Sequence, residues 1–358
     1  MIERRIRLAV ALVIAALAGV PAGAAAGPRG IDPVTVHVFH RDAIHFDQDE
    51  PDRFAASHVR TSDNGRRISR PVTLQPPEGP CEIVARVRIH PIPNDVNAVH
   101  DKWDRAGNVR LSAPDGNDVE IVKFITAYGG FTEHEEDVTH LAPLLRGERT
   151  FHAWIDTWVS PAWLVDFELT FRPAEADSVP EWMAPWLDEA PRRAPDWATG
   201  VLYAEQVTRE DLDAGDLVRE LVVPEGTRRT ELRVLSSGHC TDGSGADEFV
   251  SKDHVITVDG KEVHRYRPWR TDCRAFRDRN PYCRRWFDGS WSADYDRSGW
   301  CPGDRVEPLV LDLTEHLPPG RHELGFRVVD IRPRRGDHYG YWRLSAHAVG
   351  WTDAPGGL

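Results

Sequence analysis

The sequence is poor in sulfur and shows no pattern that typically holds a metal ion. Of its 358 residues only five are cysteine and two are methionine, and no two cysteines form a Cys-x-x-Cys pair. The absence of such a pair argues against a zinc site, and the histidines are scattered rather than spaced as metal ligands. We therefore expect neither a metal ion nor another cofactor.

Positive charge is also scarce. The chain has 44 basic and 57 acidic residues, a formal net charge of -13. Because the first 26 residues contribute a net charge of +2, the rest of the chain carries -15. An acidic surface repels phosphate groups, so nucleic acid is not an expected partner. A hydrophobic content of 41% is still enough to bury a sizeable core, and the length suggests two globular domains.

A long hydrophobic run occurs only at the start of the chain. Arg4, Arg5 and Arg7 precede an apolar stretch over residues 8–20, and small residues follow up to Ala26. This layout is typical of a secretory signal peptide, whereas a membrane anchor would need about 20 apolar residues. We expect residues 1–26 to be a signal peptide, and the mature chain to be secreted or periplasmic, with no membrane span.

An exported chain changes the interpretation of the five cysteines. An oxidising compartment favours disulfides, and four cysteines lie between residues 240 and 301, in a stretch with little hydrophobic periodicity. The odd count leaves one thiol unpaired, and Cys81 is the expected one because it stands alone in the first half.

Helical periodicity is almost absent, and alternation of apolar and polar residues predicts strands instead. The clearest alternation lies in residues 83–89 and 163–171, and Asp259-Gly260 predicts the turn of a hairpin over residues 255–266. Short helical turns are expected in residues 137–145 and 210–214. Further strands are predicted over residues 35–39, 68–74, 119–125, 150–158, 230–235, 309–313, 324–329 and 341–349.

Five prolines between Pro173 and Pro195 interrupt the alternation. Proline has no backbone N–H for a sheet and is excluded from central strands, so this segment predicts a domain boundary. We expect an N-terminal domain over residues 27–172, a proline-rich linker over 173–199 and a C-terminal domain over 200–358. Both are expected to be all-β, of sandwich or jelly-roll size.

Two motifs in the first half combine acids with aromatic residues. Asp104 stands between Trp103 and Arg105 in a polar loop, an arrangement also typical of an ordinary surface turn with an ion pair. Asp156, in the predicted strand Thr150–Trp158, would share a face with Trp154 and Trp158. A solvated sheet face is the plain alternative for that second motif.

Two segments of the second half complete the set. Glu248 precedes a predicted strand and is uninformative alone, since solvent exposure is its default. The segment Asp296–Gly303 is denser, because it packs Arg297, Trp300 and Cys301 into one short loop with turn residues.

At these segments the chain resembles the secreted peptide-N-glycosidase F family, the amidases that remove asparagine-linked glycans. The resemblance rests on residues 101–105 with Asn108-Val109, on 124–128, on 156–158 with 165–167, and on 296–303, in the family's order. It covers roughly residues 100–350. It implies two antiparallel eight-stranded jelly rolls side by side, with the active site in the groove between them.

The resemblance also implies which acids act. The family's essential aspartate falls on Asp104 and its second-domain glutamate on Glu248, with His254 at the matching offset. The third acid falls on Asp156, where the family enzyme has a glutamate, so this chain departs from the pattern there.

The remaining family positions concern binding and disulfides. Arg105 and Arg297 match arginines of the site, Trp103 and Trp158 match aromatic residues that face the glycan, and Trp300 offers a further flat face. Cys273 and Cys301 match a family disulfide. A local pair of Cys240 with Cys283 would substitute for family disulfides whose cysteines are missing here.

The implied reaction is hydrolysis of the bond between asparagine and N-acetylglucosamine in an N-glycosylated protein or glycopeptide. A positioned water, a carboxylate base and donors for the growing oxyanion suffice for it, and no metal is needed. A non-catalytic glycan-binding protein on the same scaffold is the alternative. A copper monooxygenase, also built on paired jelly rolls, is disfavoured because it needs a thioether ligand, and only Met1 and Met183 are present.

Overall fold

A computed structural model describes residues 32–94, 98–113, 116–173, 194–241 and 245–352. The predicted signal peptide and most of the predicted proline-rich linker lie outside these residues. Within the described part, no helix is long and apolar enough to cross a membrane.

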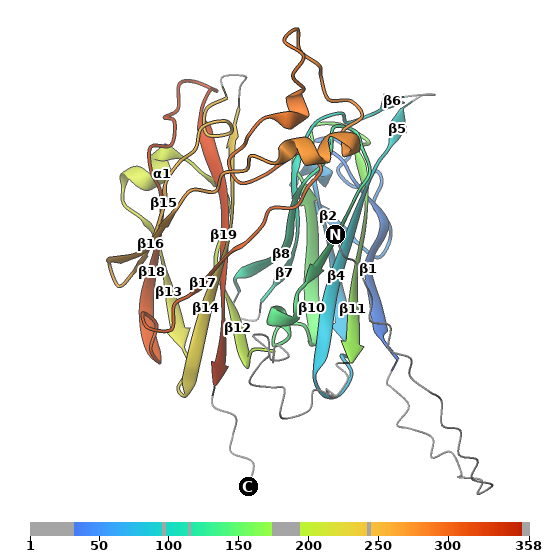
Figure 1. Ribbon diagram of the computed structural model, residues 1–358. Helices are drawn as coiled ribbons and strands as arrows, with labels where there is room; N and C mark the ends of the chain where they lie inside the picture. Colours follow the sequence, from blue (N-terminus) through green and yellow to red (C-terminus); the bar gives the residue numbers. More distant parts are fainter. Residues whose placement is uncertain (1–31, 95–97, 114–115, 174–193, 242–244, 353–358) are drawn as a thin grey trace, which may run out of the picture. The chain divides into compact units, whose positions relative to one another are not determined.

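The first half of the described chain forms two antiparallel sheets that enclose one hydrophobic core (Figure 1). One sheet has four strands in the order β1-β11-β4-β9, and the other has five in the order β2-β3-β10-β7-β8. Their bounds are β1 (Val34–Ile44), β2 (Arg60–Ser62), β3 (Arg67–Leu74), β4 (Cys81–Pro91), β7 (Ala106–Ser112), β8 (Asp118–Ile125), β9 (Thr132–Asp137), β10 (Gly147–Ile155) and β11 (Trp163–Pro173). A small ribbon of β5 (Pro93–Asn94) and β6 (Ala98–Val99) and the short helices η1 (Asp63–Gly65) and η2 (Thr139–Leu141) complete it.

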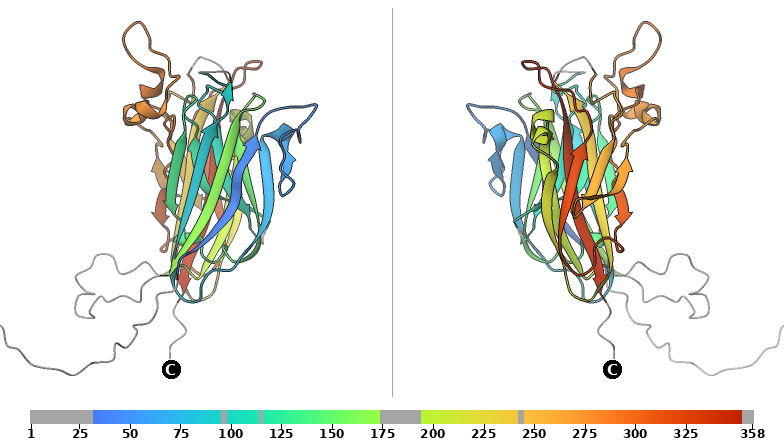
Figure 2. Two further views of the ribbon diagram at one scale, coloured as in Figure 1. Left: turned by 90° about the vertical axis from the view of Figure 1, so that its right-hand side faces the viewer. Right: turned by 90° about the vertical axis from the view of Figure 1, so that its left-hand side faces the viewer.

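The second half forms two four-stranded antiparallel sheets around a separate core. The strand orders are β12-β19-β14-β17 and β13-β18-β15-β16. The bounds are β12 (Trp197–Val207), β13 (Leu217–Val223), β14 (Thr227–Cys240), β15 (His254–Val258), β16 (Lys261–Tyr266), β17 (Leu309–Asp312), β18 (Gly320–Val328) and β19 (Gly340–Thr352). The helices are α1 (Arg209–Asp213), η4 (Cys273–Arg279) and η5 (Ser292–Asp294). The views in Figure 2 show both sheet pairs from the sides.

The alternation of apolar residues explains these layers and confirms the all-β prediction. In β11 the residues Trp163, Val165, Phe167, Leu169 and Phe171 are all fully buried in the first core. The hairpin of β15 and β16 turns at Asp259 and Gly260, whose φ angles of 49° and 76° lie in the left-handed region that this turn requires.

Three expectations about the strands need correction. The strand expected over Thr150–Trp158 ends at Ile155. The N–H of Asp156 still donates to the carbonyl of Ala106 in register with β7, but the N–H of Thr157 turns back to the carbonyl of Ile155 at 2.8 Å and the chain leaves the ladder. Strand β12 begins at Trp197, inside the predicted linker, where it pairs with β19. The first pair of sheets has nine strands instead of eight, because the three-residue edge strand β2 joins β3.

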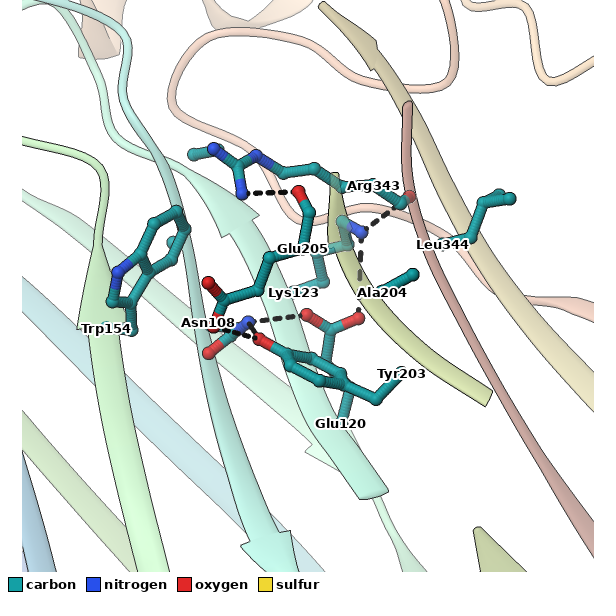
Figure 3. A pocket seen from close by; sticks show the side chains of 11 residues that line it. Asn108, Glu120, Lys123, Trp154, Tyr203, Ala204, Glu205, Arg343 and Leu344 are labelled. Carbon is teal, nitrogen blue, oxygen red and sulfur yellow. Dashed lines mark hydrogen bonds and ion pairs between the residues drawn. The ribbon is translucent and has the colours of Figure 1, made fainter. Parts of the chain in front are cut away.

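Strand β8 brings the two halves together. Its described residues are buried on both faces, one face against its own core and the other against β12 and β19. The second face carries charge: Lys123 Nζ lies 3.6 Å from Glu120 Oε2 and donates to the carbonyl of Arg343 at 3.0 Å (Figure 3). Burial lowers the pKa of Lys123, and the nearby Glu120 carboxylate opposes this shift. The sequence shows these residues only as polar interruptions of a strand.

The cysteines give one disulfide among the described residues, Cys273–Cys301, which agrees with the family pattern. The expected Cys240–Cys283 disulfide is wrong. The two thiols lie in different surroundings: Cys240 Sγ donates to Glu248 Oε2 at 3.3 Å, whereas Cys283 lies near Asp294 and Arg277. Cys81 is unpaired, as predicted.

Candidate active site

Asp104 lies in a loop that a buried aspartate holds in place. The side chain of Asp101 is fully buried and accepts hydrogen bonds from Arg105 Nε at 3.0 Å and Thr157 Oγ1 at 2.6 Å. Thr126 Oγ1 donates to the carbonyl of Trp103 at 2.9 Å and accepts from the N–H of Arg105 at 2.8 Å. These bonds fix both sides of Asp104, so its carboxylate is positioned by the start of β7 and the end of β8.

Glu248 is held by the residue before it. Asp247 is fully buried with a φ of 61°, and its two carboxylate oxygens accept from Trp342 Nε1 at 3.1 Å and from the N–H of Arg332 at 2.9 Å. The carbonyl of Glu248 accepts from the N–H of Ser298 at 3.0 Å. The segment after β14 is therefore tied to both β19 and the loop that carries Arg297. His254, whose offset from Glu248 matches the family pattern, is buried on β15 against Ser236 and does not line the site.

Arg297 joins the two acids from the two halves of the chain. Its side chain is 1% exposed, and Nη1 lies 2.6 Å from Glu248 Oε1 and 3.2 Å from Asp104 Oδ2. Nη2 donates to the carbonyl of Ser292 at 2.8 Å and to the hydroxyl of Tyr128 at 3.3 Å. The disulfide Cys273–Cys301 and paired backbone bonds with Arg270 hold the Arg297 segment. The structure thus places Asp104 and Glu248 around one nitrogen atom.

Trp300 has a different place from the one expected. It is 2% exposed, its Nε1 donates to the carbonyl of Gly238 at 2.8 Å, and the Arg297 guanidinium lies 4.3 Å from the centre of its ring. Its ring lies between the Arg297 guanidinium and the ring of His239, so although an edge of it reaches the cleft it has no open face for a sugar ring.

Burial shifts the pKa of both acids upward. The pKa of Glu248 rises to about 7 because burial disfavours its charge; the Arg297 guanidinium opposes this shift and the Asp104 carboxylate reinforces it. The pKa of Asp104 is also raised by burial, although Arg297, Tyr128 and Arg105 favour its ionised form. The arginines therefore act in the expected direction, but burial has the larger effect. Two such carboxylates titrate as a coupled pair.

Asp156 is held between arginines from both halves of the chain. Its Oδ2 accepts from Arg343 Nη2 at 2.6 Å, and its Oδ1 accepts from Arg66 Nη1 at 3.2 Å. Arg343 also lies 4.5 Å from the ring centre of Trp154, and Arg66 lies 4.7 Å from that of Trp158. Two guanidinium groups therefore neutralise the charge of Asp156. The position of this carboxylate depends on the docking of β19 against the first half.

All three acids line one cleft of about 650 Å³. Its walls come from both halves of the chain, and Arg66, Arg105, His239, Tyr341 and Arg343 contribute to them. Trp103 and Trp158 line this cleft and are 60% and 59% exposed, although Arg66 lies over the ring of Trp158. Indole faces stack well on the apolar faces of sugar rings, whereas the acids and arginines suit hydroxyl groups.

Sequence reasoning missed several groups of this site. Tyr128 belongs to the quoted motif 124–128 but has no predicted role. Arg66 lies outside every predicted strand, Arg343 lies in a predicted strand without an assigned role, and Cys240 is expected in a disulfide. Only the fold brings Arg66, just before β3, to the same cleft as β14 and β19. Among the described residues no group of three or more histidine, cysteine or acidic side chains could hold a metal ion.

The fold and the site together define a two-domain all-β protein with a cleft lined by paired carboxylates. Residues 204–349 match the family described as "Peptide-N-glycosidase F, C terminal". No curated protein matches the sequence. This match lies in the second half of the chain, and the resemblance to the peptide-N-glycosidase F family drawn from the sequence motifs is confirmed.

Solved structures with a similar fold extend the likeness to both halves. PNGF-II matches with a TM-score of 0.73 and 22% identity over 90% of this chain, which spans 66% of the length of PNGF-II. PNGase F, a glycosylasparaginase from Flavobacterium meningosepticum, matches with a TM-score of 0.67 and 17% identity over 92% of this chain and 98% of its own. A peptide-N(4)-(N-acetyl-β-D-glucosaminyl)asparagine amidase matches with a TM-score of 0.61 and 18% identity over 91% and 98% of the two chains.

Proposed function

We propose that the protein is an amidase that hydrolyses the bond between asparagine and N-acetylglucosamine in N-glycosylated proteins or glycopeptides. The observation that carries this proposal is the sharing of Arg297 by Asp104 and Glu248, two acids from different halves of the chain. Paired groups with perturbed pKa values in a cleft are typical of catalytic sites. The similarity to the glycosylasparaginase and amidase structures supports the same reaction class.

In this proposal Asp104 is the general base. A water molecule beside its carboxylate gives up a proton as its oxygen attacks the side-chain carbonyl carbon of the asparagine. A carboxylate with a raised pKa is a stronger base, and general-base catalysis typically contributes about 10² to 10⁴ in rate. The Arg297 guanidinium opposes the rise in the pKa of Asp104 and so favours its ionised form.

Glu248 would act on the leaving group. A pKa of about 7 leaves a large share of this side chain protonated near neutral pH, so it can donate a proton to the nitrogen of the departing glycosylamine. The oxyanion that grows on the carbonyl oxygen needs donors, and the Arg105 guanidinium in the cleft wall is the candidate. The products are a peptide in which aspartate replaces asparagine, and a glycosylamine.

Asp156 and the two exposed indoles would hold the sugar. Asp156 accepts hydrogen bonds from Arg66 and Arg343, and a sugar hydroxyl can share this cluster. Trp103 and Trp158 offer their ring faces to the same ligand. These groups bind the glycan without taking part in the bond-breaking step.

A glycan-binding protein without activity is the second candidate, because exposed indoles around a cleft serve binding equally well. Incubation with a denatured N-glycoprotein in oxygen-18 water separates the two. An amidase releases the glycan and leaves an aspartate that carries one heavy oxygen. A binding protein retards the glycoprotein on a column but leaves its peptide mass unchanged, and that result would contradict the amidase proposal.

The proposal also includes export of the protein and its division into two domains. The first 26 residues support a signal peptide, and the disulfide Cys273–Cys301 fits an oxidising compartment. The separate cores support two domains of jelly-roll type on either side of the proline-rich segment. Mass spectrometry of the exported protein tests the first point, since cleavage after Ala24 or Ala26 gives a defined N-terminus.

A further inference from the structure

A second groove of about 1160 Å³ adjoins the cleft at the paired acids. Trp103, Asp104 and Glu248 line both hollows. A bond that lies at these two acids therefore has both open spaces beside it. The linkage in an N-glycoprotein has two unlike sides, a glycan and a polypeptide.

The two hollows differ in chemistry, as the glycan and the polypeptide do. Acids, arginines and indoles line the cleft. The groove gathers a larger apolar surface from Phe249, Trp269, Tyr282, Trp286 and Tyr295, and it also carries charged groups, among them Arg284, Asp294 and Asp296. Sugar hydroxyls need many hydrogen-bonding partners, which the cleft supplies. Peptide side chains gain more from apolar faces, which the groove supplies.

One wall of the groove is a hairpin over residues 284–292, which we call the aromatic hairpin. Ser292 holds its base, where its N–H donates to the carbonyl of Arg284 at 2.8 Å and its Oγ accepts from the N–H of Arg284 at 2.9 Å. At the turn, the N–H of Trp286 donates to the carbonyl of Ser290 at 2.8 Å. Trp286 is 37% exposed and Phe287 is fully exposed. The hairpin, drawn in orange, extends past the ends of the strands in Figures 1 and 2.

The aromatic hairpin carries two arginines, Arg284 and Arg285, and one aspartate, Asp288. The neighbouring Arg277 is already paired with Asp294, which lines the groove together with Asp296. The Arg284 guanidinium lies 4.0 Å from the ring centre of Trp286, and those of Arg277 and Arg285 lie 5.7 Å from that of Trp291. Such stacked arginines keep their charge beside an apolar face, which suits a ligand with both acidic and aromatic groups.

We propose that the groove and the aromatic hairpin bind the polypeptide that carries the glycosylated asparagine, with a preference for acidic and aromatic residues beside it. This inference rests on the proposed amidase function for the placement of the scissile bond. The sugar lies in the polar cleft, the peptide lies in the groove, and the amide bond lies between them at Asp104 and Glu248. The enzyme would then select its substrates by peptide sequence as well as by glycan.

The first test compares substrates that share one glycan. One is the glycan on a single blocked asparagine, one is a twelve-residue glycopeptide with aspartate and phenylalanine beside the asparagine, and one has lysine and serine there. We expect Trp286→Ala to lower kcat/KM for the acidic glycopeptide about tenfold through KM, as truncation of an aromatic anchor typically does. Its kcat/KM for the blocked asparagine should stay unchanged.

A matched control exists in the same chain. Trp351 also packs under an arginine, with the Arg229 guanidinium 4.9 Å from its ring centre, but it lies at the other end of β19 and lines neither hollow. Trp351→Ala should leave all three substrates unaffected. Trp158→Ala, in the glycan cleft, should weaken all three to a similar extent.

The second test is independent of catalysis. Fluorescence anisotropy with the unglycosylated acidic peptide measures binding to the wild type and to Trp286→Ala, and we expect a loss of about tenfold in affinity. If no glycan is released from any substrate but this loss is seen, the amidase proposal fails and the groove proposal stands. If Trp286→Ala affects neither peptide binding nor the glycopeptide, or affects all three substrates equally, the groove proposal is overturned.

Discussion

Asp104 Oδ2 and Glu248 Oε1 lie 3.2 Å and 2.6 Å from the same atom, Nη1 of Arg297. The two acids are far apart along the chain and belong to different sheet pairs. Each is held by a fully buried aspartate of its own segment, Asp101 in one case and Asp247 in the other. The docking of the two halves is thus a condition for the site, and the following predictions depend on it.

Asp104→Asn is expected to lower the release of N-glycans by at least about 10²-fold, because the amide cannot take a proton from water. The fold should be unchanged, since asparagine has the same shape. Mass spectrometry of a glycopeptide measures the release, and circular dichroism checks the fold. Asp213→Asn, an equal loss of charge on α1, is the control. Release at the wild-type rate by Asp104→Asn would refute its assignment as base.

Asp156→Glu restores the side chain that the family enzyme has at this position. We expect activity on simple N-glycopeptides to hold or rise, because a carboxylate one methylene longer still reaches Arg66 and Arg343. Asp156→Ala should lower activity through KM, since both arginines lose their shared partner and the sugar loses an acceptor. Steady-state kinetics separates the two effects. A collapse of activity in Asp156→Glu would show that the site is adapted to the shorter chain.

The thiol of Cys240 is expected to tune the pH profile. Protonated Glu248 is the proposed proton donor, so the rate should fall as pH rises through about 7. The Cys240 thiol donates to the Glu248 carboxylate and favours its ionised form. Cys240→Ala removes this bond, raises the pKa of Glu248 and should move the falling limb to higher pH. A shift to lower pH, or none, would contradict the proposed role of Glu248.

Arg297→Met removes the only charge that the two acids share in the described structure. Loss of one partner from a buried ion pair typically costs about 3–5 kcal/mol. Without the guanidinium the pKa values of Asp104 and Glu248 rise further above their unfolded values, so the lost stability is larger at high pH and smaller where both acids are protonated. Urea unfolding at pH 5 and pH 8 measures this difference. An equal loss at both pH values would mean that Arg297 stabilises mainly by packing.

The disulfide Cys273–Cys301 closes a segment with a sequence separation of 28 residues. Chain entropy predicts that its removal costs about 3–4 kcal/mol. The double variant Cys273→Ser with Cys301→Ser should therefore melt at lower temperature and lose activity first, because Arg297 lies within this segment. Calorimetry and glycan release in parallel check both effects. Melting at the wild-type temperature would show that packing of Trp300 alone holds the segment.

The sequence predicted the layers of the fold because a strand with one buried face alternates apolar and polar residues along the chain. The alternation in β4, β11 and the β15–β16 hairpin was sufficient, and the predicted strands there agree with the structure. It did not predict β7, because the residues of this strand are buried on both faces and the alternation disappears. The end of β10 was missed because the N–H of Thr157 turns back to the carbonyl of Ile155, and the residue pattern does not reveal this local turn.

For the site, the family resemblance carried by the short motifs pointed to Asp104, Glu248, Asp156 and Arg297, because local side-chain patterns survive in the sequence. It did not show that Trp300 is covered, that Cys240 faces Glu248, or that Arg66 and Arg343 hold Asp156. These facts depend on which faces of β3, β14 and β19 meet across the two halves. A linear sequence records the neighbours of a residue along the chain, but burial, charge pairing and pKa depend on neighbours in space, which only tertiary packing decides.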